Sequence, residues 1–256
     1  MKYHLQNCIA LFLGLFFNAT YGWKTTLEIL KDNGITAEVH YVTTDDGYIL
    51  TNHRINGGEN STPVVLVSGV SITGSCWLMR GRNDSLAYLL ADQGYDVWLI
   101  NNRGTNYGLS HVNLTSDDSQ FWKFSILRHN IHLQEKNKLQ IYQTIWNLLF
   151  ASYGKGTSMD NILHYAQNLM SAGKFREYDY GQKKNMEIYN STSPPDYDLT
   201  AINVPTVFYV AKKDWIAVYS DAEKAYKMLA NGKGFNVVNY EAFSHADFVY
   251  AKDVKK

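Results

Sequence analysis

The stretch that decides the fold is residues 204–245, VPTVFYVAKKDWIAVYSDAEKAYKMLANGKGFNVVNYEAFSH. It begins with an apolar run typical of a strand, Val204–Val210, and continues with an amphipathic stretch typical of a helix, Ser220–Ala230. A second strand pattern follows at Phe235–Tyr240. A strand, a helix and a strand of these lengths form a right-handed crossover unit in a parallel sheet. The stretch therefore predicts an α/β fold.

Two side chains with acid–base chemistry follow these strands. Asp214 comes after the first strand and His245 after the second. Because the carboxyl ends of parallel strands meet at one edge of a sheet, we expect the two side chains to lie together at the edge where open α/β sheets bind ligands. A carboxylate that orients an imidazole is two thirds of a Ser-His-Asp triad, in which the imidazole takes the proton of the serine.

The third member of such a triad is missing from the sequence. A serine hydrolase of this class carries its nucleophile in Gly-x-Ser-x-Gly, ahead of the Asp and the His. No such motif occurs, and the near matches Gly69–Thr73 and Gly156–Asp160 lack the closing Gly. Ser71 is a possible substitute, but no helix is predicted to begin there, and a loop hydroxyl bonded to local backbone is the simpler interpretation.

Length and charge exclude several classes of function. A chain of 256 residues with 45% hydrophobic and 19% charged residues is typical of a globular domain with one sizeable core. Its 24 Lys and Arg balance 24 Asp and Glu, so no long-range field attracts nucleic acid. We predict no nucleic-acid partner.

The N-terminus is typical of a secretory signal peptide. Lys2 precedes an apolar core, Cys8–Phe17, and small residues follow it. This core is too short to span a bilayer, and a buried first helix is the alternative. Removal of residues 1–22 would leave Cys76 as the only thiol, which excludes an intrachain disulfide.

Potential glycosylation sites also indicate the secretory pathway. Four Asn-x-Ser/Thr triplets lie in the expected mature chain, at Asn60, Asn83, Asn113 and Asn190. We therefore expect a glycoprotein that is secreted or lysosomal.

The first part of the chain alternates strand and helix patterns. We predict a helix at Thr26–Lys31 and a hairpin of Glu38–Thr43 with Tyr48–Ile55, turned by the Asp46-Gly47 pair. The next predicted elements are a strand buried on both faces, a helix whose apolar face holds Leu86, Leu89 and Leu90, and another buried strand. They span Val64–Val67, Asn83–Asp92 and Asp96–Ile100.

The middle of the chain contains no strand pattern. Ile126–Tyr153 and Thr157–Ser171 are helical in character. His129 and His132 could face one side of a helix as metal ligands, but no third ligand lies near them, and we expect a solvated pair and no metal or cofactor. The apolar residues of Ile141–Phe150 fit either a lipid-facing surface or a core.

Several of these stretches together resemble the acid lipase family, the α/β hydrolases that include gastric and lysosomal acid lipases. The match covers roughly residues 23–125 and 156–251. The matching pieces are Asp46–Leu50, His53–Ile55, Asn83–Leu99, Asn102–Gly104, Asp117–Asp118, Phe121–Trp122, His164–Gln167, Pro194–Tyr197, Asp214–Trp215 and His245–Phe248.

The resemblance implies a role for each site residue. Asp214 would be the triad acid, His245 the triad base, and the backbone N–H of Val70 one donor of the oxyanion hole. The chain departs from the family at Ser68-Gly69, where family members carry His-Gly. Because the proposed donor is the backbone N–H of Val70, the change of side chain at position 68 affects it less than it would affect a role of that side chain.

A larger departure is a missing block. In family members the Phe-Trp segment leads to the nucleophile strand, its helix and the first part of a lid, whereas here Ser125 runs within about thirty residues into the late lid segment at Gly156. The resemblance thus implies an α/β-hydrolase-like, mostly parallel sheet without its central strand and elbow. Either Asp96–Ile100 and Val204–Val210 then become edges, or the sheet closes around a different neighbour.

We divide the chain accordingly into a signal peptide (1–22), the N-terminal half of the hydrolase core (23–125), a truncated helical lid (126–195) and the C-terminal part of the core (196–256). One hypothesis is a secreted hydrolase of lipid esters, such as triacylglycerols or sterol esters, of which this sequence is an incomplete version. The other, which we favour for the chain as written, is an inactive remnant that binds lipid or a partner. A transmembrane span is not expected.

Overall fold

The computed structural model describes residues 24–124, 156–171 and 173–251. The predictions for residues 1–22 and for Ile126–Tyr153, with its histidine pair and its apolar stretch, lie outside these ranges. Within them, no helix combines the length and the apolar character that a bilayer crossing needs.

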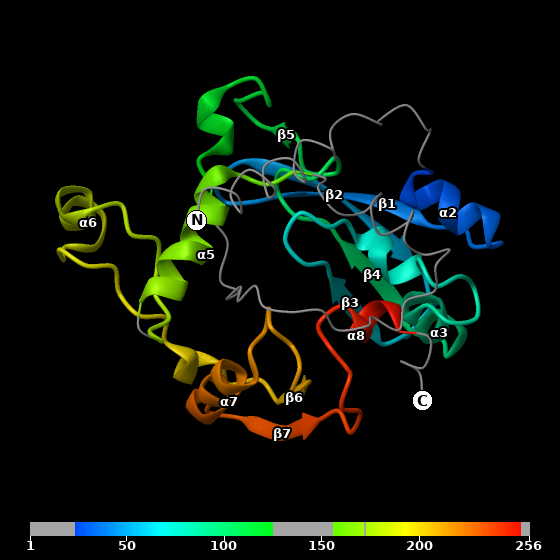
Figure 1. Cartoon of the computed structure of the whole chain (residues 1–256). Coiled ribbons are helices and arrows are strands. Elements are labelled where there is room, and N and C mark those ends of the chain that lie inside the picture. Colours follow the sequence, from blue (N-terminus) through cyan, green and yellow to red (C-terminus); the bar gives the residue numbers. More distant parts are fainter. Residues whose placement is uncertain (1–23, 125–155, 172, 252–256) are drawn as a thin grey trace, which may run out of the picture.

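A five-stranded mixed sheet forms the N-terminal half (Figure 1). Its order is β1 (Glu38–Thr43), β2 (Tyr48–Ile55), β4 (Asp96–Ile100) and β3 (Pro63–Val67), and β5 (Ser110–His111) also pairs with β2. The pairs that involve β2 are antiparallel, and β3 with β4 is parallel. The predicted hairpin is confirmed, and the α/β class is confirmed with a sheet that is mixed.

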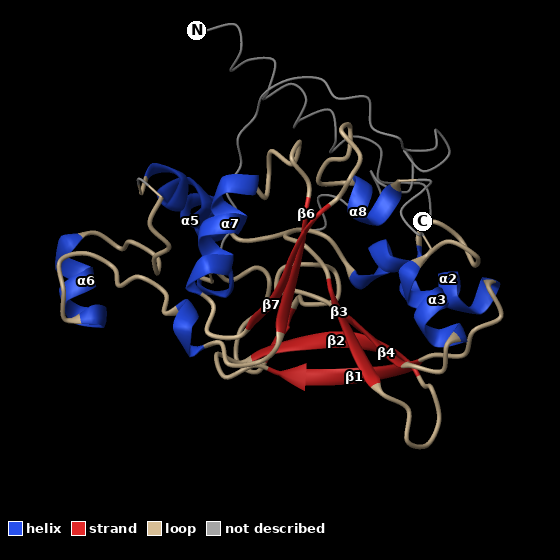
Figure 2. Ribbon diagram, turned by 90° about the horizontal axis from the view of Figure 1, so that it is seen from below, coloured by secondary structure: helices blue, strands red, loops and turns tan. Residues whose placement is uncertain are grey.

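The C-terminal crossover unit is confirmed as well. Strands β6 (Thr206–Val210) and β7 (Gly232–Val237) are parallel and are connected through helix α7 (Tyr219–Met228). β7 begins and ends three residues earlier than predicted, because its pairing with β6 runs out where Val210 meets Val237. Among the described residues these two strands form a sheet of their own, and Figure 2 shows β6 crossing the direction of β1 and β2.

The edge of the large sheet differs from the expectation. Asp96–Ile100 is not an edge, because β4 lies between β2 and β3, and β3 is the terminal strand instead. The edge predicted at Val204–Val210 is confirmed, since among the described residues β6 pairs only with β7. The prediction that Val64–Val67 is buried on both faces is also wrong. Leu66 is buried, whereas Val65 and Val67 are each 57% exposed, since no described element covers that face of the strand.

Two short helices close the main core against the sheet. Helix α2 (Thr26–Asp32) begins with a capping box, in which the Thr25 hydroxyl accepts from the Glu28 N–H and the Glu28 carboxylate accepts from the Thr25 N–H. Helix α3 (Leu86–Asp92) begins later than predicted, after Ser85. It buries Ala87 and Tyr88, and of the predicted leucine face Leu90 packs on the core. The core cluster comprises Leu30, Ile55, Leu66, Leu78, Ala87, Tyr88, Val97 and Leu99.

Other helices are short or lie apart from this core. The turn η1 (Gly74–Leu78) follows β3, and α8 (Asp247–Tyr250) packs on it through Cys76, Met79 and Tyr250. Helix α5 (Met159–Met170) confirms the helix predicted at Thr157–Ser171. Figure 1 shows α5 and α6 on the side away from α2 and α3. The remaining elements are α6 (Gln182–Tyr189), η2 (Ser119–Trp122) and η4 (Leu199–Ala201).

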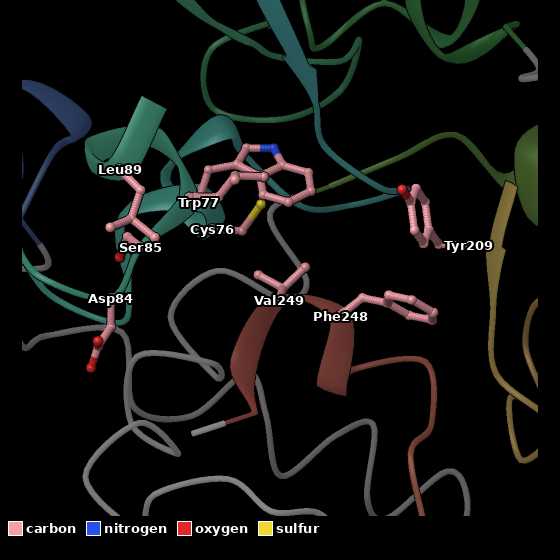
Figure 3. A pocket seen from close by; sticks show the side chains of 9 residues that line it. Cys76, Trp77, Asp84, Ser85, Leu89, Tyr209, Phe248 and Val249 are labelled. Atoms are coloured by element: carbon pink, nitrogen blue, oxygen red, sulfur yellow. The ribbon is translucent and has the colours of Figure 1, made fainter. Parts of the chain in front are cut away.

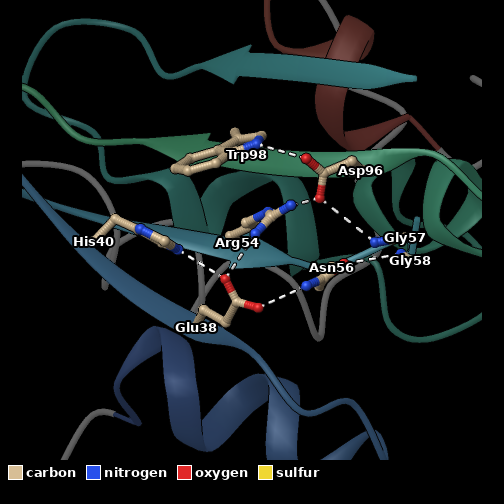
Figure 4. Close-up of polar contacts among 8 residues, drawn as sticks. All are labelled: Glu38, His40, Arg54, Asn56, Gly57, Gly58, Asp96 and Trp98. Carbon is tan, nitrogen blue, oxygen red and sulfur yellow. Dashed lines mark hydrogen bonds and ion pairs between the residues drawn. The ribbon is translucent and has the colours of Figure 1, made fainter. Parts of the chain in front are cut away.

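A polar network fastens β1, β2 and β4 to one another (Figure 4). The Arg54 guanidinium donates to Asp96 at 2.8 Å and to Glu38 at 3.0 Å, and it lies over the Trp98 ring. Hydrogen bonds, first from the Asn56 amide and then from its other neighbours, lower the pKa of Glu38 to about 2. These contacts set the strand register that carries the loops of the site.

Candidate active site

Asp214 is held in one orientation by its own loop. The residue lies four positions after the end of β6, and its side chain is nearly fully buried. One carboxylate oxygen accepts the N–H groups of Ile216 at 2.9 Å and Ala217 at 2.7 Å. The other oxygen faces the imidazole of His245. With its backbone donors satisfied, this carboxylate stays in place without a second charged partner.

His245 lies in the loop between β7 and α8. Its Nδ1 is 3.0 Å from the Asp214 carboxylate, and its side chain is 37% exposed. The next turn is fixed by Asp247, which accepts from the N–H and the hydroxyl of Ser244 at 2.8 and 2.9 Å. A carboxylate acceptor at Nδ1 places the proton on that nitrogen, so Nε2 is the atom that can take a proton from a reacting group.

The loop after β3 supplies a backbone donor. Ser68 donates to the Ile100 carbonyl at 3.2 Å, and the Asn102 amide donates to the Ser68 and Gly69 carbonyls. Ser71 has a left-handed φ of 57°, which turns the chain sharply. Among the described residues the N–H of Val70 has no hydrogen-bond partner, as an oxyanion donor requires.

This loop and the histidine loop meet through apolar contacts. Ile72 and Ala246 both pack on the cluster formed by Cys76, Met79 and Tyr250. Ala246 directly follows His245, so the loop of Val70 and the imidazole belong to one end of the molecule. Within the described ranges, no hydrogen bond joins Ser71 to the imidazole.

The remaining predictions concern glycosylation sites and metal binding. The four sequon asparagines, Asn60, Asn83, Asn113 and Asn190, are all exposed, as glycan attachment requires, and their glycosylation stays a prediction. The described part of the chain holds no cluster of His, Cys, Asp or Glu fit for a metal ion.

One feature of the site was not predicted. A cavity of about 420 Å³ lies between η1, α3, β6 and α8, the helix that begins two residues after His245 (Figure 3). Its lining comes from four stretches that are far apart in the sequence, so no local pattern signals it. The only hint was the leucine face predicted for Asn83–Asp92, because Leu86 and Leu89 line this cavity instead of the core.

The known proteins that are similar to this chain include several lipases. The family described as a partial alpha/beta-hydrolase lipase region matches residues 26–81. Lipase 1 of Drosophila melanogaster is 26% identical over 337 residues, covering 90% of this chain and 76% of its own. Lipase member M of Mus musculus is 36% identical over 148 residues, covering 52% of this chain and 33% of its own. Gastric triacylglycerol lipase of Bos taurus is 26% identical, covering 98% and 93%.

Among solved structures, an esterase from Exiguobacterium antarcticum matches with a TM-score of 0.42 and 15% identity, covering 83% of this chain and 94% of that chain.

The alignments also contain large gaps. The 337 positions aligned with the Drosophila lipase exceed the 90% of this 256-residue chain that they cover, which is about 230 residues. About a hundred positions of that alignment therefore have no counterpart in this chain.

Proposed function

Because this chain is an acid lipase-family protein, we propose that it keeps the orienting half of a lipase active site without hydrolysing esters. In this proposal the protein travels the secretory route, carries glycans on its exposed asparagines, and serves as a binding protein for lipid. Its relatives are lipases, which makes lipid the first ligand class to consider.

One observation carries the proposal: the Asp214–His245 hydrogen bond is present while the sequence has no Gly-x-Ser-x-Gly motif. His245 can act as a general base only toward a hydroxyl within hydrogen-bond reach. In a Ser-His-Asp enzyme, removal of the serine alone lowers turnover by about 10⁶. The remaining rate would be close to undetectable.

The gapped alignment supports the same conclusion. The proposed missing block would hold the nucleophile strand, its helix and part of the lid, and such a block is of the size that the alignment gaps allow. The exposed valines of β3 fit this account, because the terminal strand of the large sheet would otherwise be covered by a neighbour.

A second candidate is an active lipase of which this sequence is an incomplete version. Two observations support it: the Asp214 carboxylate is hydrogen-bonded to the His245 imidazole, and the N–H of Val70 makes no hydrogen bond within the described residues. Sequencing of transcripts across the junction near Ser125 separates the two candidates. An in-frame block that restores Gly-x-Ser-x-Gly would establish the second.

The activity itself is tested with a fluorophosphonate probe, which reacts only with an activated serine. The full chain, secreted from cultured cells, is treated beside bovine gastric triacylglycerol lipase as a positive control. We expect the control to be labelled and this chain to remain unlabelled. Labelling of any serine in the wild-type chain that disappears in the His245→Ala variant would overturn the proposal.

A further inference from the structure

The sequence contains three Asn-Gly pairs, Asn33-Gly34, Asn56-Gly57 and Asn231-Gly232, and the structure describes all of them. Such a pair is prone to deamidation, because a glycine leaves its backbone nitrogen accessible to the side-chain carbonyl carbon of the preceding asparagine. The reaction requires this nitrogen and this carbon to approach each other. The local fold therefore decides which of the three pairs reacts.

Two of the pairs are held in arrangements that oppose the reaction. The side-chain amide of Asn33 donates to the Ile29 carbonyl at 2.8 Å, which turns it back along α2, and the next N–H donates to a carbonyl of the same helix at 3.0 Å. The side-chain amide of Asn231 donates to the Asn203 carbonyl at 2.8 Å, and the glycine that follows is the first residue of β7. In both pairs the side chain is bonded away from the nitrogen that would attack it.

Asn56 has the opposite arrangement (Figure 4). Its Oδ1 accepts the N–H of Gly58 at 2.8 Å, and this Asx-turn bond folds the side chain forward over the backbone of Gly57. The N–H of Gly57 makes only a long contact of 3.4 Å, to the Asp96 carboxylate. Asn56 is also exposed, so water reaches it. The attacking nitrogen thus lies beside the carbonyl carbon, and the N–H of Gly58 can stabilise the oxyanion that forms there.

We propose that Asn56 is a deamidation site, at which the Gly57 nitrogen attacks the side-chain carbonyl carbon. A bond forms between this nitrogen and Cγ, the bond from Cγ to Nδ2 breaks, and ammonia leaves with the proton of the Gly57 N–H. Water then opens the succinimide at either carbonyl, which leaves aspartate or isoaspartate at position 56, and the ammonia takes up the proton of the new carboxyl group. The inference goes beyond the proposed function and holds for either of its candidates.

The modification adds a negative charge to the network that joins β1, β2 and β4. The Asn56 amide donates to the Glu38 carboxylate at 2.7 Å, and Glu38 also accepts from Arg54 at 3.0 Å (Figure 4). The new carboxylate cannot donate this hydrogen bond, and it repels Glu38. Deamidation therefore weakens the network, and the effect decreases as salt screens the two exposed charges.

Deamidation rates at the three pairs test the proposal. The full chain is incubated at pH 7.5 in ¹⁸O-labelled water, once folded and once in urea, and each Asn-Gly peptide is quantified by mass spectrometry. In the folded protein we expect the rate at Asn56 to equal or exceed its rate in urea, with one ¹⁸O in the product. Folding should slow the rates at Asn33 and Asn231 by about tenfold or more. An equal slowing at all three pairs, or no product at Asn56, would refute the proposal.

Urea unfolding of two variants tests the consequence. Asn56→Asp reproduces the aspartate product, whereas Asn56→Ala removes the same hydrogen bond without adding a charge. We expect a lower urea midpoint for Asn56→Asp than for Asn56→Ala, and a difference that decreases as sodium chloride is added. Equal midpoints at low salt would contradict the repulsion of Glu38.

Discussion

Acid should destabilise this protein through one buried histidine. His53 lies on β2 with a side chain that is 1% exposed, 3.4 Å from the Asn101 amide and edge-on to the Tyr107 ring. Burial lowers the pKa of His53 to about 4, from an ordinary value of 6.5. The folded protein thus holds this imidazole neutral at a pH where the unfolded chain protonates it.

The sign and the size of the effect follow from proton linkage. Between pH 6.5 and about 4 the unfolded chain binds more protons than the folded one, so the free energy of unfolding decreases as the pH falls. Each pH unit in this window is worth up to about 1.4 kcal/mol. The loss from His53 is therefore about 2 kcal/mol at pH 5 and about 3 kcal/mol at pH 4.

Urea unfolding at pH 7.5 and pH 5 measures this loss. The His53→Phe variant keeps a ring against Tyr107 but cannot be protonated, so its stability should decrease by about 2 kcal/mol less between the two pH values than that of wild type. An equal decrease in the wild type and in His53→Phe would refute the reasoning.

Four substitutions test other local arguments, each by its urea midpoint. Thr25→Ala removes the hydroxyl of the capping box and should cost about 1 kcal/mol; no change would mean that the cap does not stabilise α2. Gly47→Ala forces a side chain onto a φ of 91° and places Cβ 2.7 Å from the His111 ring, so it should cost about 2 kcal/mol or more. Gly34→Ala, with a φ of 74° and open space, should cost about 1 kcal/mol, and an equal cost at both glycines would contradict the steric argument. Asp214→Ala leaves two backbone N–H groups without their acceptor and should cost about 1–3 kcal/mol, whereas a neutral result would show that the loop finds other acceptors.

Local sequence patterns were sufficient for several elements. The Asp46-Gly47 pair predicted the β1–β2 hairpin with both strands at their observed bounds, because the turn requires a positive φ that Gly47 supplies. The crossover of β6, α7 and β7 was predicted from apolar periodicity, and its topology implies that Asp214 and His245 leave neighbouring strand ends.

Properties that depend on a neighbour could not be predicted in the same way. An apolar run such as Val64–Val67 does not reveal whether a strand covers its second face, and here Val65 and Val67 are exposed. The leucine face of α3 was correctly seen as apolar, yet Leu86 and Leu89 face a cavity rather than a core.

The sequence indicated which residues form the candidate site, but not the hydrogen bonds that hold them in place. Chain order and strand ends indicated Asp214 and His245, but the two N–H groups that hold the carboxylate come from a loop conformation without a sequence pattern. The Asn102 amide, which fastens the loop of Val70 by two hydrogen bonds, was likewise not identified as a supporting residue.

The central claim is that an intact carboxylate–imidazole pair remains here without a serine to activate. The most direct measurement compares hydrolysis of p-nitrophenyl butyrate by the wild-type chain and by the His245→Ala variant at equal concentration. We predict the same background rate for both proteins. A wild-type rate above background that the His245→Ala variant loses would contradict the claim.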